Sequence, residues 1–151
     1  MTAYPDTSFL CALYREQDHS SEADAYRLHM KEPLSVSPLL EFEFRQAIRL
    51  QVFLHSQDKK KGYGQPEADQ MLADWESDLA AGIVQIVPVD HDAVLRMAVF
   101  LSSTHAMKGG HRTLDILHVA TARHLAARDF LTFDARQKKL AKAIGLRTPL
   151  N

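Results

Sequence analysis

Short apolar runs alternate with longer stretches of helical periodicity, and this alternation constrains the fold more than any other feature of the sequence. Stretches typical of strands occupy residues 2–6, 34–37, 82–89 and 129–133, with a possible last one at 146–149. Stretches typical of helices occupy residues 7–17, 20–32, 37–54, 66–79, 90–107, 113–127 and 134–145. This order predicts an α/β domain, in which helices wrap a mostly parallel central sheet of four to five strands in three layers.

The size and charge of the chain limit what it can be. Its 151 residues suffice for a single domain with one core, and neither a repeat nor a dividing linker interrupts residues 1–151. The 18 basic and 19 acidic residues give a net charge of -1, so the field of the whole molecule does not attract nucleic acid strongly. A polyanionic partner would have to be held by a local group of cations.

Cysteine content and hydropathy indicate an intracellular protein. Cys11 is the only cysteine, which excludes an internal disulfide and a cysteine-rich zinc site, and its apolar surroundings predict a buried, reduced thiol. No apolar run reaches the ~18 residues needed to span a bilayer. The first twenty residues include three acids and do not resemble a signal peptide. We therefore expect a cytoplasmic protein without a membrane partner.

Aspartates follow two of the predicted strands. Asp6 ends the first strand and Asp134 ends the fourth, which is where functional groups of open α/β sheets usually lie. Both also fit a structural role, because aspartate is a favoured helix N-cap. Gln137, three residues after Asp134, resembles the second member of a capping box. Position alone therefore leaves both roles open.

Two further acids lie near the starts of predicted helices. Glu41 stands among apolar residues on a helix that we expect to be largely buried, although pairing with Arg45 one turn on would also explain it. Glu43 points about 160° away around the same helix and is expected to meet solvent. Asp115 occupies the first turn of the helix that begins at Thr113, where the helix dipole favours an acid in any case.

Together, the four acids Asp6, Glu41, Asp115 and Asp134 would form a cation site at one edge of the sheet. Two carboxylates ~4 Å apart repel by about 4 kcal/mol at an effective dielectric near 20, so such a group needs a cation or a proton. Oxygen ligands without cysteine select a hard ion such as Mg²⁺ or Mn²⁺. A hard ion on carboxylates suits phosphodiester hydrolysis, because it activates water and neutralises charge on the phosphate.

The segments that carry these acids resemble the motif blocks of PIN-domain ribonucleases, particularly the VapC-type toxins of bacterial toxin-antitoxin pairs. The segments are YPDTSFL with Asp6, SPLLE with Glu41, RTLDILHVATA with Asp115 and FLTFDARQKKLAKAIGL with Asp134, and they span residues 4 to about 148. The resemblance implies a parallel sheet of order 3-2-1-4-5, a homodimer, and a cognate antitoxin that inserts into the active-site groove. Pro5 departs from this pattern, since it removes a hydrogen-bond donor from a central strand and predicts a short or bent one.

The resemblance also implies roles for individual residues. It assigns the ligands of one or two Mg²⁺ or Mn²⁺ ions, which direct water at an RNA phosphodiester, to Asp6, Glu41, Asp115 and Asp134. Thr7 and Thr132 would lie beside this metal site. His118 lies one turn after Asp115 on the same helix face and could approach the metal or the phosphate, but a packed histidine explains it as well.

Several cations could contact an RNA substrate. Lys59, Lys60 and Lys61 share a polar loop with an aromatic residue, and Arg112 and Arg136 flank the predicted acids. A solvated loop and favourable helix-dipole contacts explain the same five residues, so these assignments are open.

Competing functions leave fewer traces in the sequence. The glycine motif of dinucleotide-binding proteins and the phosphate-binding loop of nucleotide hydrolases are both absent. The alternative is a non-catalytic RNA- or protein-binding module on the same fold. Four intact acids argue against it, because a site that binds no metal has no reason to keep crowded like charges. The sequence therefore predicts a Mg²⁺- or Mn²⁺-dependent endoribonuclease, the toxin of a type II toxin-antitoxin pair.

Overall fold

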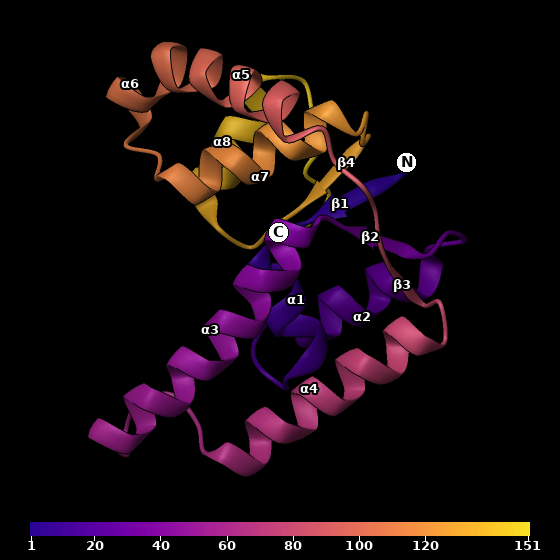
Figure 1. Ribbon diagram of the computed structural model, residues 1–151, viewed down its shortest axis with the longest axis vertical. Helices are drawn as coiled ribbons and strands as arrows, with labels where there is room; N and C mark the ends of the chain where they lie inside the picture. Colours follow the sequence, from indigo (N-terminus) through magenta and orange to yellow (C-terminus); the bar gives the residue numbers. More distant parts are fainter.

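The computed structural model describes all 151 residues as an α/β fold, as predicted. Its strands are β1 (Ala3–Pro5), β2 (Leu34–Val36), β3 (Val84–Ile86) and β4 (Asp129–Leu131). Its helices are α1 (Thr7–Tyr14), α2 (Ser20–His29), α3 (Pro38–Gln57), α4 (Gln65–Ala80), α5 (His91–Leu101), the π-helical turn η1 (Ser102–Ala106), α6 (Met107–Gly109), α7 (Thr113–His124) and α8 (Ala135–Ala143). The strands lie between two groups of helices, α1–α4 and α5–α8 (Figure 1).

All strand pairing is parallel, but the strands form two short ladders rather than one sheet. β1 pairs with β4, and β2 pairs with β3. β2 lies beside β1, which gives the spatial order β3-β2-β1-β4, yet no ladder joins these two central strands (Figure 1). The possible strand at 146–149 is reduced to a single bridge between Asp129 and Arg147. The structure therefore confirms four parallel strands, but it does not confirm that they form one continuous central sheet.

Pro5 explains the interruption. The N–H of Asp6 donates to the carbonyl of Leu131 in β4 at 2.9 Å. Because backbone groups alternate in direction along a strand, the nitrogen of the preceding Pro5 faces β2, where it has no hydrogen to donate. β1 is three residues long, which agrees with the short strand predicted from Pro5, although the other three strands have the same length.

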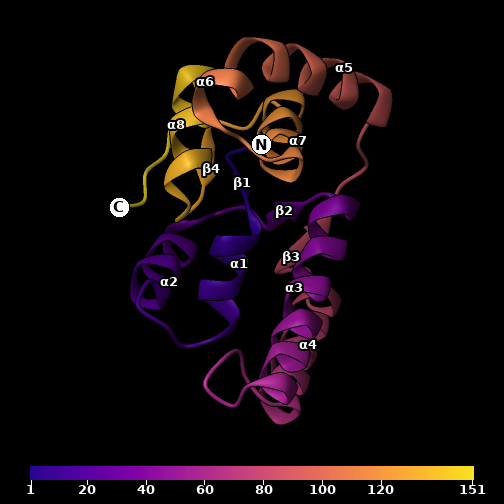
Figure 2. The same cartoon turned by 90° about the vertical axis from the view of Figure 1, so that its left-hand side faces the viewer.

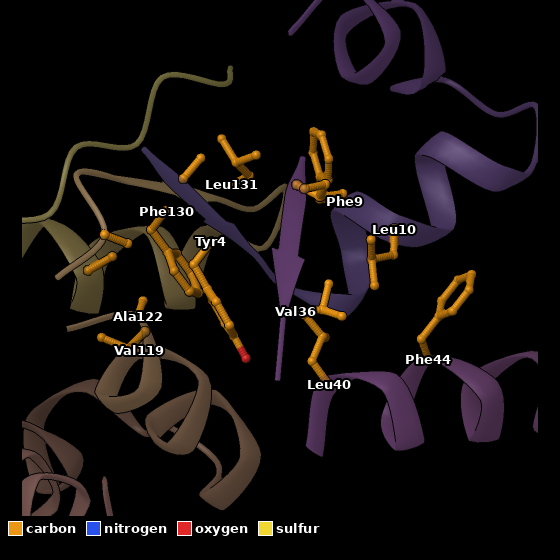
Figure 3. Packing of buried hydrophobic residues seen from close by; sticks show 14 of the residues in the cluster. Tyr4, Phe9, Leu10, Val36, Leu40, Phe44, Val119, Ala122, Phe130 and Leu131 are labelled. Carbon is orange, nitrogen blue, oxygen red and sulfur yellow. The ribbon is translucent and has the colours of Figure 1, made fainter. Parts of the chain in front are cut away.

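The hydrophobic core holds β1 and β4, the two strands that Asp6 and Asp134 follow. Tyr4 of β1 and Phe130 of β4 are register partners whose rings stack with centroids 6.4 Å apart. They face Val119 and Ala122 of α7, as Figure 3 shows. On the other side, the core continues into α1 and α3 through Leu10, Leu40 and Phe44, which are all fully buried. β1, β4, α1, α3 and α7 therefore share one packed interior.

Helices α3 and α4 form an antiparallel pair that extends away from the strands (Figure 2). Phe44 of α3 packs on Trp75 of α4 with ring centroids 4.9 Å apart, and Tyr14 of α1 meets Trp75 edge-on at 5.5 Å. None of the helices combines the length and the apolar character that a membrane span requires. The loop that carries the three lysines lies at the far tip of this pair, distant from the strand ends (Figure 2).

Most predicted helix starts are confirmed by their caps, and some details differ. Ser37 accepts the N–H of Leu40 at 3.1 Å, and Asp90 accepts that of Ala93 at 3.0 Å. The segment predicted as a helix over 90–107 is helical from His91 to Gly109, but Ser102–Ala106 take the π form of η1. Cys11 is a free thiol but only partly buried, so the prediction of a buried thiol was too strong. Burial nevertheless raises the pKa of this thiol to about 12.

Candidate functional site

Asp6 is the centre of the polar cluster at the carboxyl ends of β1 and β4. It has no exposed surface, although it is a carboxylate. Its Oδ1 accepts hydrogen bonds from the Ser8 hydroxyl at 2.6 Å and from the backbone N–H of Phe9 at 3.0 Å. Its Oδ2 accepts from the Thr132 hydroxyl at 2.5 Å and from the Gln137 amide at 2.9 Å. Asp6 therefore caps α1 with one oxygen and binds side chains of the segment after β4 with the other.

The two hydroxyls that contact Asp6 are themselves oriented by the chain that follows β4. Ser8 Oγ accepts the N–H of Phe133 at 2.9 Å, and Thr132 Oγ1 accepts the N–H of Asp134 at 2.9 Å. Because each hydroxyl accepts on one side, its own hydrogen is directed at the carboxylate. The two strand ends are thus joined through the side chain of Asp6.

Burial raises the pKa of Asp6, because an ionised carboxylate loses its hydration in the interior. The hydrogen bonds from Ser8, Thr132 and the N–H of Phe9, and the charge of His118, oppose this effect without cancelling it. The pKa of Asp6 therefore lies above its ordinary value. Perturbed carboxylates of this kind concentrate at functional sites.

Asp134 keeps one oxygen for the cap and leaves the other uncommitted. Its Oδ1 accepts the N–H groups of Arg136 at 2.8 Å and Gln137 at 2.9 Å, which confirms the predicted cap of α8. Oδ2 accepts no hydrogen bond, and the residue is exposed. Gln137 does not complete a capping box, since its side chain turns to Asp6 instead. Asp134 can therefore cap the helix and still present a carboxylate oxygen to a ligand.

Glu43 joins the cluster, contrary to the expectation that it would face solvent. One oxygen, Oε2, contacts both the hydroxyl of Thr7 on α1 and Nε2 of His118 on α7. Burial would raise the pKa of Glu43, but the hydrogen bond and charge of His118 and the hydroxyl of Thr7 outweigh it, so this pKa lies below its ordinary value. Glu43 is the functional candidate that sequence reasoning missed.

Glu41 lies on the opposite flank of α3 and does not reach the cluster. Its Oε1 accepts two hydrogen bonds from Arg45, one from Nε at 3.1 Å and one from Nη2 at 2.9 Å. Arg45 also binds Glu76 of α4 at 2.6 Å. The alternative named for Glu41 in the sequence, pairing with Arg45, is the contact that the structure has.

Asp115 lies in the first turn of α7 and is partly buried. Its Oδ2 accepts the N–H of Arg112 at 3.2 Å, while Oδ1 accepts no hydrogen bond. His118, three residues later, has only 1% of its surface exposed and is therefore a packed histidine. The contacts of Glu43 with His118 and Thr7 therefore join helix α3 to the middle of α7 and to the start of α1.

The predicted RNA-contacting cations are all exposed, at two different places. Arg112 and Arg136 flank the acids at the starts of α7 and α8. Lys59, Lys60 and Lys61 follow the end of α3, and at 1.5 Å per residue Lys59 lies roughly 24 Å along the chain axis from Glu43. The arginines, but not the lysines, lie beside the acid cluster.

The side chains fit a hard divalent ion by donor type. Glu43, Asp115 and Asp134 each keep one carboxylate oxygen that accepts no hydrogen bond, and oxygen is the donor that Mg²⁺ and Mn²⁺ prefer. No three acidic, histidine or cysteine side chains are gathered closely enough to hold one ion in this arrangement. Binding an ion through three carboxylates would therefore require side-chain rotation.

Structures of similar fold are known. VapC20 of Mycobacterium tuberculosis, described as a toxin that cleaves the sarcin-ricin loop, has a TM-score of 0.66 at 17% identity, over 99% of this chain and 100% of its own. FitAcB of Neisseria gonorrhoeae has a TM-score of 0.69 at 16% identity, over 99% and 97%. PAE2754 of Pyrobaculum aerophilum has a TM-score of 0.58 at 17% identity, over 98% and 89%. At these identities the likeness shows the fold.

Sequence comparison identifies the family. No curated protein sequence matches the chain. The family model of the PIN domain, however, matches residues 3–143, which include β1, β4 and all the acids described above. The chain therefore belongs to the PIN-domain family.

Proposed function

We propose that the protein is a metal-dependent endoribonuclease and the toxin of a type II toxin-antitoxin pair. The observation that carries this proposal is the fully buried carboxylate of Asp6, held at two strand ends with further acids at the adjacent helix starts. The fold shared with VapC20, a toxin described as cleaving an RNA loop, supports the same activity. Mg²⁺ or Mn²⁺ is the proposed cofactor, because the donors are carboxylate oxygens.

The proposal assigns the acidic group to Asp6, Glu43, Asp115 and Asp134. Glu43 takes the place that the sequence assigned to Glu41, because Glu43 contacts residues of α1 and α7 whereas Glu41 is paired with Arg45. A divalent ion bound by the free oxygens of Glu43, Asp115 and Asp134 would lower the pKa of a water molecule and offset charge on the scissile phosphate. Asp6, whose two oxygens already accept four hydrogen bonds, would hold the strand ends beside them. Oδ2 of Asp134 accepts no hydrogen bond within the protein and would be free to accept one from that water molecule, which would orient the water.

RNA is proposed to approach over the starts of α7 and α8. Arg112 and Arg136 are exposed there, and the helix N-termini favour phosphate groups. Lys59, Lys60 and Lys61 lie too far away to contact the same phosphate, so we assign them to a distant part of a long RNA. Removal of either arginine should weaken binding more than removal of one lysine.

Exposed apolar side chains provide surface for protein partners. Phe42 and Phe53 on α3 are 63% and 58% exposed, and Val99 and Phe100 on α5 are 70% and 61% exposed. Apolar side chains exposed in this way often mark protein interfaces. We propose that a cognate antitoxin and a second copy of the chain cover these two surfaces, in the cytoplasm, where toxin, antitoxin and RNA would meet.

The proposed activity is tested by incubating the purified protein with total cellular RNA and Mg²⁺ or Mn²⁺. Wild-type protein should cleave the RNA, while an EDTA-treated sample and an Asp6→Asn variant should leave it intact. Intact RNA in every sample would refute the proposal. RNA binding without cleavage would favour the alternative, a non-catalytic binding module on the same fold.

A further inference from the structure

The mechanism described above makes no use of His118, although this residue lies inside the cluster. Its side chain is 1% exposed, so it cannot reach a substrate phosphate directly. Its Nε2 contacts Oε2 of Glu43, and its Nδ1 is buried without a hydrogen-bond partner. The contact with Glu43 is therefore the one hydrogen bond through which His118 can position another side chain of the site.

The contact determines which oxygen of Glu43 is available. An ionised carboxylate only accepts hydrogen bonds, so both Nε2 of His118 and Oγ1 of Thr7 must donate to Oε2. No donor reaches Oε1. Two donors on one oxygen fix the carboxylate rotation, and they leave Oε1 as the atom that Glu43 can offer to a ligand.

The same contact also joins two acids from different helices. Asp115 and His118 are three residues apart on α7 and therefore lie on one face of it. Glu43 belongs to α3, whose first turn is held to β1 by the 2.7 Å hydrogen bond between Ser37 and Tyr4. His118 thus links the carboxylate of α3 to the helix that carries Asp115.

We propose that His118 is a positioning residue, which donates its Nε2 hydrogen to Glu43 and thereby holds this carboxylate in the orientation that the site requires. The inference rests on the proposed function, since the orientation matters only if Glu43 serves the reaction. Groups that orient the ligands of metal sites in this way typically change metal affinity or activity by about 10–100-fold when removed.

A first experiment measures the contact without any metal or substrate. Long-range ¹H–¹⁵N NMR spectra of the protein labelled at histidine should show the hydrogen of His118 on Nε2, with a proton shift that changes strongly in the Glu43→Gln variant. The Glu41→Gln variant is the matched control and should leave the His118 signals in place. An Nε2 without a hydrogen in the wild-type protein would overturn the inference.

A second experiment measures the effect on activity through a double-mutant cycle. His118→Leu should lower the cleavage rate about 10–100-fold, whereas His118→Gln, which keeps an N–H donor at a similar place, should retain at least roughly a third of the rate. In the Glu43→Gln background, His118→Leu should have little further effect, because its partner is already changed. Equal losses in both backgrounds would refute the positioning role. If the wild-type protein itself cleaves no RNA, the proposed function fails, while the NMR result still decides the contact.

Discussion

At the scale of single residues, the burial of Asp6 lowers the free energy of unfolding at neutral pH, because the ionised carboxylate loses its hydration. The four hydrogen bonds to its carboxylate satisfy its acceptors, but they do not compensate fully for lost hydration, and its pKa stays raised. A proton is therefore bound more tightly in the folded protein than in the unfolded chain. The free energy of unfolding consequently falls as the pH rises from about 4, the unfolded value, through the folded pKa.

The Asp6→Asn variant should therefore be more stable than the wild-type protein at neutral pH. The amide removes the buried charge, and the Gln137 side chain can rotate to accept from it. We expect a gain of roughly 1–2 kcal/mol in the free energy of unfolding at pH 7, measured by urea denaturation. The difference should shrink as the pH falls from 7 to about 4, because the wild-type aspartate takes up its proton over this range while the amide does not titrate. A variant less stable than wild type at neutral pH would contradict this account.

The identity of the acid on α3 shows where residue patterns stop being informative. Leu40, Phe44 and Ile48 form the buried stripe of α3. Relative to Leu40, Glu41 lies about 100° to one side and Glu43 about 60° to the other. Both acids flank the stripe, so the pattern cannot tell which flank meets α4 and which meets α7. That choice is made by tertiary packing, through Arg45 and Glu76 on one side and His118 on the other.

At the scale of elements, the alternation of strands and helices along the chain and most helix caps followed from local sequence, whereas the continuity of the ladders and the π form of one helical segment did not. Asp6, Ser37, Asp90 and Asp134 all cap the helices that follow them. Cap positions are predictable because a side chain bonds to backbone groups two or three residues away. The π turn of η1 has no capping side chain, so no local hydrogen bond of this kind marks it in the sequence. The absence of a ladder between β1 and β2 was not predictable in the same way, because it depends on which neighbouring strand the nitrogen of Pro5 faces.

The double role of Asp134 at the start of α8 can be separated by one substitution. Asp134→Ser keeps a side-chain oxygen that accepts the N–H of Gln137, so the free energy of unfolding should change by less than about 0.5 kcal/mol. The carboxylate oxygen that lies free in the wild-type protein is lost, so RNA cleavage should fall by roughly 100-fold or more. Thermal denaturation and initial cleavage rates measure the two effects. Retained activity would reduce Asp134 to a helix cap.

At the scale of the whole molecule, the fold brings four distant segments to one place. The segments that carry Asp6, Glu43, Asp115 and Asp134 span most of the chain, and they are linked by the hydrogen bonds of Thr7 and His118 to Glu43 and of Thr132 to Asp6. The order of the segments was readable from the sequence, because each follows a strand or begins a helix. Contacts across the site, such as those of Gln137 with Asp6 and of His118 with Glu43, were not, because they join residues more than 70 positions apart.

The most direct test of the proposed site compares two glutamates on the same helix. Initial rates of RNA cleavage in Mn²⁺ should be measured for the wild-type protein and for the Glu43→Gln and Glu41→Gln variants, with folding checked by circular dichroism. Glu43→Gln should lose roughly 100-fold or more of the rate. Glu41→Gln should stay within about threefold of wild type, since Glu41 is paired with Arg45 and contacts neither Thr7 nor His118. Loss of activity in Glu41→Gln with full activity in Glu43→Gln would contradict the site described here.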